Sequence, residues 1–173
     1  MLKRAMADIT IRRAKPGDEK AIAEMINLGI KRKNWQYTGT NKPCSKKKIK
    51  EMRKAYLPGS NNVVFVALEK NKIVGSTAFR FKKHGRMRHR VDCGWGVHPD
   101  YQGRGIATKL LKASLAFAKK KGFKRAEAEV AVENTASIKL AKKLGFKIEG
   151  RKKKALLTDG GRYIDTVIVG KIL

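Results

Sequence analysis

The chain has 173 residues, and its 42 lysines and arginines against 14 aspartates and glutamates give a formal net charge of +28. This length suits one domain with a core of its own, and two cysteines are too few for a disulfide framework, so we expect reduced thiols in a cytoplasmic protein. We expect no membrane span, no signal peptide and no metal site, because long apolar runs and clustered ligands are missing from the sequence.

The first half of the chain predicts a strand, two helices and a hairpin, after a flexible leader over residues 1–8. Alternating apolar residues indicate the strands, and a proline or a capping residue indicates each helix start. The elements expected here are, in chain order, a strand at 9–14, a helix from Pro16-Gly17-Asp18, a helix capped by Ser45 and ended by Pro58-Gly59, and strands at 62–68 and 73–81. The polar segment between the two helices contains Trp35 and Tyr37.

The second half predicts strands that alternate with helices and then a final hairpin. The elements expected here are, in chain order, a strand at 90–97, a helix that runs to Lys121, a strand at 126–132, a helix capped by Asn134, and strands at 147–157 and 162–172. In the first of these helices we expect a buried stripe that begins at Ala107 and continues at Leu110 and Leu111. The turn at 158–161 is typical of a hairpin.

The segment Gln102-Gly103-Arg104-Gly105-Ile106-Ala107 has the composition of a phosphate-binding turn. It follows a strand and begins a helix, so free N–H groups point at an anion, and the glycines let that anion approach closely. A Walker-type loop is excluded, because Ile106 and Ala107 stand where a lysine and a serine or threonine are needed. A dinucleotide fingerprint is disfavoured, because Thr108 replaces its third glycine.

Two motifs in the expected order resemble those of the GCN5-related N-acetyltransferase (GNAT) family. The pattern Gln102-x-x-Gly105-x-Ala107 resembles the family's pyrophosphate loop, and Asn134-x-Ala136 followed by Gly145-Phe146 resembles its second signature. This resemblance implies a single α/β (α+β) domain over residues 9–173. The implied sheet is mixed, mostly antiparallel and six- to seven-stranded, splayed between its fourth and fifth strands and flanked by about four helices.

The resemblance also implies acetyl-CoA as cosubstrate. The backbone N–H groups from Gln102 to Ala107 would hold its pyrophosphate, and the strand Trp95-Gly96-Val97 would pair with the pantetheine arm and donate to the thioester oxygen. Glycines at 94 and 96 suit a close approach of ligand to backbone. Asn134 is expected to contact the coenzyme, although a helix-capping role alone would explain it.

Acetyl transfer to an amine needs a group that accepts a proton from the acceptor ammonium. Glu129 is the first candidate, because it resembles the base of the ribosomal-protein alanine N-acetyltransferases, a branch of the family. Asp92 is the alternative, and a solvated or salt-bridged role would explain either carboxylate. Ala141 stands where many members carry a general-acid tyrosine, and Tyr163 is a candidate replacement. Trp35 and Tyr37 are implied acceptor contacts, unless they only cover the edge of the core.

We therefore predict a cytoplasmic N-acetyltransferase that transfers acetyl directly, in a ternary complex, to a primary amine on a protein lysine or N-terminus. We expect a monomer or a homodimer. Polyamines are disfavoured as acceptors, because the positive field repels them. The alternative is a catalytically weak protein of this fold that binds RNA or ribosomes through its basic surface, since such a charge attracts any polyanion.

Overall fold

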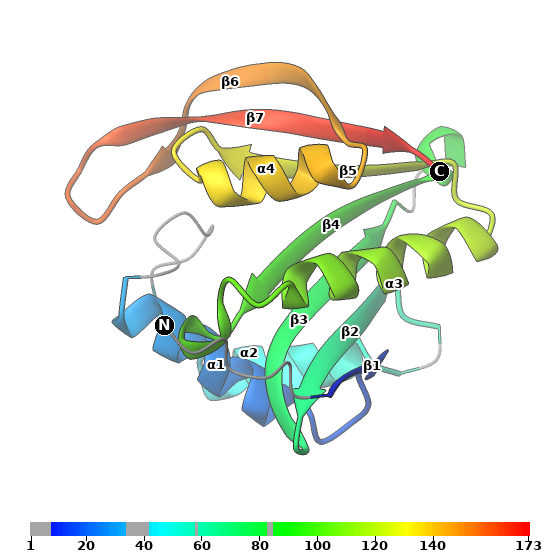
Figure 1. The fold of residues 1–173 in the computed structure, drawn as a ribbon, viewed down its shortest axis with the longest axis vertical. Helices are drawn as coiled ribbons and strands as arrows, with labels where there is room; N and C mark the ends of the chain where they lie inside the picture. Colours follow the sequence, from blue (N-terminus) through cyan, green and yellow to red (C-terminus); the bar gives the residue numbers. More distant parts are fainter. Residues whose placement is uncertain (1–7, 34–41, 58, 83–84) are drawn as a thin grey trace.

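The computed structural model describes residues 8–33, 42–57, 59–82 and 85–173 (Figure 1). Within these residues, seven strands form one sheet in the order β1-β2-β3-β4-β5-β7-β6. The helices and strands are β1 (Ile9–Arg13), α1 (Glu19–Lys31), α2 (Lys46–Lys54), β2 (Asn62–Glu69), β3 (Lys72–Phe81), β4 (Arg90–Val97), α3 (Ile106–Lys120), β5 (Arg125–Ala131), α4 (Thr135–Lys143), β6 (Lys147–Leu157) and β7 (Tyr163–Ile172). The β4–β5 pair is parallel and the other neighbouring pairs are antiparallel.

The helices cover both faces of the sheet (Figure 1). On one side, which we call the α3 face, Leu111 of α3 and Ala141 of α4 share a buried cluster with Val130 of β5. On the other side, the α1 face, Ile22 of α1 is buried against Val66 of β2, and α2 packs beside this cluster. The fold is therefore the mixed, splayed sheet with four helices that the sequence predicts.

Two of the predicted helix caps are confirmed. The Ser45 hydroxyl accepts a hydrogen bond from the Lys48 N–H (3.2 Å) at the start of α2. The Asn134 side-chain oxygen accepts one from the Ser137 N–H (3.1 Å) at the start of α4. Each cap satisfies a backbone donor that has no partner inside the helix, and so fixes where the helix begins.

Two details of the prediction are wrong. The buried stripe of α3 begins at Ile106, which is 1% exposed, whereas Ala107 is only half-buried. The reason is Gly75 of β3, where a Cβ would lie 3.1 Å from the Ile106 side chain, so the missing side chain makes room for Ile106. In addition, α2 ends at Lys54, because Ala55 already forms its C-cap, rather than at Pro58-Gly59.

The expected acceptor contacts Trp35 and Tyr37 lie outside the described residues. Within the described part of the chain, no helix combines the length and the apolar character that crossing a membrane requires.

Candidate active site

The two central strands of the sheet diverge. They pair in parallel over three residue pairs only, the last of which joins Asp92 to Glu127. Beyond this point β4 continues to Val97 paired with β3, and β5 continues to Ala131 paired with β7. We call this divergence the β4–β5 splay; it opens toward the C-terminal ends of both strands (Figure 1).

Backbone N–H groups of β4 face the splay from alternate residues. The His98 N–H, directly after β4, donates to the Val74 carbonyl of β3 (2.9 Å). Because alternate residues of a strand direct their backbone groups to opposite neighbours, Gly96 also faces β3, and the N–H groups of Trp95 and Val97 face the splay. An extended ligand with amide groups would meet these donors as it would meet a neighbouring strand.

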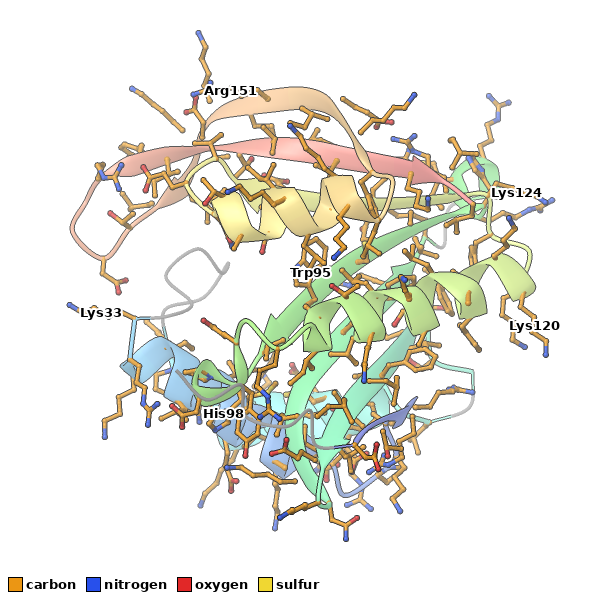
Figure 2. The ribbon with its side chains drawn as sticks, in the orientation of Figure 1. Lys33, Trp95, His98, Lys120, Lys124 and Arg151 are labelled. Carbon is orange, nitrogen blue, oxygen red and sulfur yellow. The ribbon has the colours of Figure 1, made fainter. Side chains whose placement is uncertain are left out.

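The α1 face of β4 is exposed at Gly94, beside the splay. Cys93 is buried in the α3-face core, so Gly94 and Gly96 lie on the opposite, α1 face. Gly94 is exposed, and no atom lies within 4 Å of the position a Cβ would take there. The Trp95 side chain lies on the α3 face, between α3 and α4 (Figure 2). Two ligands can therefore approach the splay from opposite faces.

The turn from β4 to α3 has the backbone conformation of an anion-binding turn. Gly103 and Gly105 have positive φ angles of 75° and 73°, and a Cβ at either position would meet no atom within 4 Å. Both glycines are therefore required by backbone conformation rather than by crowding. Gly105 is the N-cap of α3, and the first turn carries no acidic side chain. The first N–H groups of the helix, from Ile106 on, are available to phosphate oxygens.

The side chain of Arg104 is held away from this helix start. It forms an ion pair with Glu69 at the end of β2, and its guanidinium lies 5.1 Å from the centre of the Tyr101 ring. Tyr101 in turn packs edge-on against His98 (5.1 Å between ring centres). The His98 ring accepts a hydrogen bond from the Asp100 N–H (3.2 Å), and burial lowers the pKa of His98, which favours this neutral acceptor. These contacts hold the Arg104 side chain beside the turn, and the sequence did not predict them.

An ionic cluster holds the closed end of the splay. Arg90 and Arg125 are neighbours in register across β4 and β5, and both donate to Glu127. Burial alone would raise the pKa of Glu127, but the hydrogen bonds from the two arginines outweigh it, so the pKa is lowered and the carboxylate stays charged. Arg125 also pairs with Glu149 of β6, which extends the cluster across the sheet.

Neither free cysteine is suited to nucleophilic catalysis. The Cys93 thiol donates to the backbone carbonyl of Glu127 (3.0 Å) at the point where the strands separate. Burial raises the pKa of Cys93 to about 12 and also raises the pKa of Cys44. Because the thiolate is the nucleophile, both groups are inert at neutral pH, which favours direct transfer over a covalent intermediate.

Of the two candidate bases, Glu129 lies at the open part of the splay. Its carboxylate accepts hydrogen bonds from the Lys152 ammonium (2.7 Å) and the Thr166 hydroxyl (2.6 Å). These bonds, led by the one from Lys152, lower the pKa of Glu129. Asp92 lies within the paired, closed end, where Lys82 holds it at 2.6 Å. Position therefore favours Glu129 as the group that an acceptor meets.

The remaining candidates have these positions. Ala141 is fully buried in the α3-face core, so α4 supplies no acid from that residue. Tyr163 is 57% exposed at the start of β7, and the Lys154 ammonium lies 5.7 Å from its ring centre. The β6–β7 hairpin that carries it extends past the open end of the splay (Figure 1). Asn134 caps α4 through its side-chain oxygen, and its side-chain N–H groups take no part in the cap.

Comparison with known proteins agrees with this geometry. The model of the acetyltransferase (GNAT) family matches residues 27–146. The chain is 29% identical over 169 residues to the L-amino acid N-acetyltransferase AaaT of Escherichia coli, covering 96% of this chain and 99% of that protein. It is 33% identical over 103 residues to N-alpha-acetyltransferase 30 of Schizosaccharomyces pombe, covering 58% of this chain and 69% of that protein.

A solved structure provides the same comparison in three dimensions. The structure of yncA from Salmonella typhimurium with its cofactor acetyl-CoA superposes with a TM-score of 0.83 at 25% identity. The match covers 95% of this chain and 94% of that one.

The turn before α3 leads to our first prediction. Gly105→Ala forces a side chain into the left-handed region, at about 1–2 kcal/mol. If the turn must keep this conformation to bind phosphate, affinity for coenzyme A falls by about 5- to 30-fold. Arg104→Ala should change the affinity by less than about threefold, because its side chain contacts Glu69 and Tyr101 instead. Titration calorimetry measures both, and a larger loss for Arg104→Ala than for Gly105→Ala contradicts the assignment.

Proposed function

This chain belongs to the GNAT family and is an N-acetyltransferase that uses acetyl-CoA, and we propose that its acceptor is the α-amino group at the N-terminus of a polypeptide. Acetyl-CoA supplies the activated acyl group as a thioester. The N–H groups at the start of α3 and that of Trp95 hold and orient it from the α3 face. The acceptor enters from the α1 face, where Gly94 is exposed and Glu129 presents its carboxylate.

The lowered pKa of Glu129 carries this choice of acceptor. A carboxylate held by Lys152 and Thr166 stays ionised and attracts an ammonium, but it is a weak proton acceptor. An α-amino group in a peptide has a pKa near 8, against about 10.4 for a lysine side chain, so near neutral pH its uncharged fraction is several hundredfold larger. A weak base therefore suits an N-terminus better than a lysine. The name of the S. pombe relative, an N-alpha-acetyltransferase, supports this proposal.

A free L-amino acid is the second candidate acceptor. It is favoured by the similarity to AaaT, which extends over nearly the whole of both chains. The physical argument against it is the α-carboxylate, whose negative charge raises the pKa of the neighbouring amine and makes its proton harder to remove.

A panel of three matched acceptors tests the proposal. One is a short peptide with a free N-terminus and no lysine, the second is the same peptide formylated and carrying one lysine, and the third is the free amino acid that begins the first peptide. We expect kcat/KM for the first to exceed that of the others by at least about tenfold, given the difference in uncharged amine. Turnover followed by mass spectrometry decides, and preference for the lysine peptide or the free amino acid refutes the N-terminal assignment.

The bare surface at Gly94 gives a steric prediction. Gly94→Val places two methyl groups on the α1 face beside the splay, where a Cβ meets no atom of the described residues within 4 Å. We expect the acceptor KM to rise by about tenfold, which corresponds to a loss of about 1.4 kcal/mol in acceptor binding. The KM for acetyl-CoA and the melting temperature should be unchanged. Ala78→Val is the matched control, because Ala78 is exposed and pairs with Gly94 one strand further from the splay. Equal effects of the two substitutions contradict an acceptor route past Gly94.

The role of Glu129 predicts a pH effect. Lys152 is the main reason that the pKa of Glu129 is lowered, so Lys152→Met raises this pKa and moves the acidic limb of kcat/KM to higher pH. Lys153→Met removes the same charge from the next residue of β6 and should leave the limb in place. Glu129→Gln should lower kcat by about 100-fold or more. If Glu129→Gln keeps full activity, or Lys152→Met leaves the limb unmoved, Glu129 is not the base.

A further inference from the structure

The exposed side of the α3 face carries lysines from two stretches of the chain that contain no acidic residue. The sequence has no aspartate or glutamate between Asp100 and Glu127, and none between Glu133 and Glu149. The exposed lysines of α3, α4 and the turn after α3, which we call the lysine surface, are Lys109, Lys112, Lys119, Lys120, Lys121, Lys124, Lys139, Lys142 and Lys143. At its borders, Glu133 and Glu149 are each paired with an arginine. The positive charge here is therefore not cancelled by the surface around it.

The lysines of this surface are spread along the two helices rather than gathered at one point. Its two helices lie on one face of the sheet and share one core cluster. Along α3, Lys109 and Lys120 are eleven residues apart, or about 16 Å at 1.5 Å per residue. Lys120 and Lys124 extend outward at the C-terminal end of α3 (Figure 2). A row of this length can contact several successive phosphates of one nucleic-acid strand.

The chemistry of this surface suits a phosphate backbone rather than base edges. All its cations are lysines, which act as point charges, whereas base readout relies on arginine, asparagine or glutamine in two-pronged contacts. Single-strand binding relies on exposed aromatic rings. The aromatic residue of α3, Phe117, is half-buried and packs against Phe65.

We propose that the lysine surface binds the phosphodiester backbone of double-stranded nucleic acid, without sequence preference, as a second activity of this protein. The C-terminal half of α3 is distinct from the pyrophosphate turn, because Lys120 lies fifteen residues, or about 22 Å, beyond Gly105. Nucleic acid bound there leaves the turn and the splay open. Such binding would concentrate the enzyme where nascent or nucleic-acid-bound proteins present their N-termini.

The test separates this surface from overall charge. Fluorescence anisotropy measures binding of an RNA duplex and a DNA duplex of about 20 base pairs, between about 50 and 200 mM salt. The triple variant Lys112→Glu, Lys119→Glu, Lys120→Glu reverses three charges of the lysine surface. Its matched control, Lys46→Glu, Lys47→Glu, Lys50→Glu, makes the same change in net charge on α2, which lies on the α1 face.

We expect the α3 variant to lower the salt slope of log affinity by about 3, one for each lost phosphate contact, and the α2 variant to leave it unchanged. The KM for acetyl-CoA should stay within about twofold in both, which shows that the fold and the pyrophosphate turn are intact. The matching Lys→Gln triple on α3 removes the same three contacts, so it should lower the slope by the same amount with a smaller loss of affinity.

Three results overturn the proposal. One is equal weakening by the two triple variants, which makes overall charge the cause. The second is no binding of either duplex by the wild-type protein. The third is displacement of the duplex by polyglutamate at equal charge concentration, which indicates a surface for acidic proteins. The acetylation assay does not depend on these three binding results, so it tests the proposed catalytic function separately.

Discussion

The short parallel contact between β4 and β5 is the constraint on which the site depends. If the pairing continued past Asp92 and Glu127, β5 would take up the backbone groups that β4 directs into the splay. Instead, the Cys93 thiol donates a hydrogen bond to the Glu127 carbonyl. This carbonyl is the acceptor that the next hydrogen bond between β4 and β5 would use. Below this point, Glu127 between Arg90 and Arg125 holds the strands together. The sheet is thus fastened at one end and open at the other.

This arrangement links stability to ligand binding. The β4–β5 ladder ends at Asp92 and Glu127, so β5 does not pair with the backbone groups that β4 directs into the splay beyond that point. In the proposed function, amide groups of a pantetheine arm would take the place of the neighbouring strand, in the way a peptide adds to a sheet edge. The cost of keeping the strands apart is met by tertiary contacts elsewhere: the ionic cluster at the closed end, and the helices α3 and α4 that pack on β4 and β5 from one side.

Local features of this fold could be predicted from the sequence, whereas contacts between distant strands could not. Periodicity and capping residues predicted the helices and strands, and Gly103 and Gly105 predicted the tight turn before α3, because each signal lies within a few neighbouring residues. The contact of Glu129 with Thr166 joins residues 37 apart and depends on the register of β5 against β7. The burial of Ile106 in place of Ala107 depends on the missing side chain of Gly75 on another strand.

The large positive charge also bears on the chemistry of transfer. With Ala141 in the core, α4 offers no proton from that position to a departing sulfur. A positive field stabilises a departing thiolate, and it also favours the uncharged form of an acceptor amine, because it disfavours the ammonium. Both effects lower the demand on the proposed base Glu129, the pKa of which is lowered by Lys152. The charge that attracts coenzyme phosphates therefore also compensates for a modest set of acid and base groups.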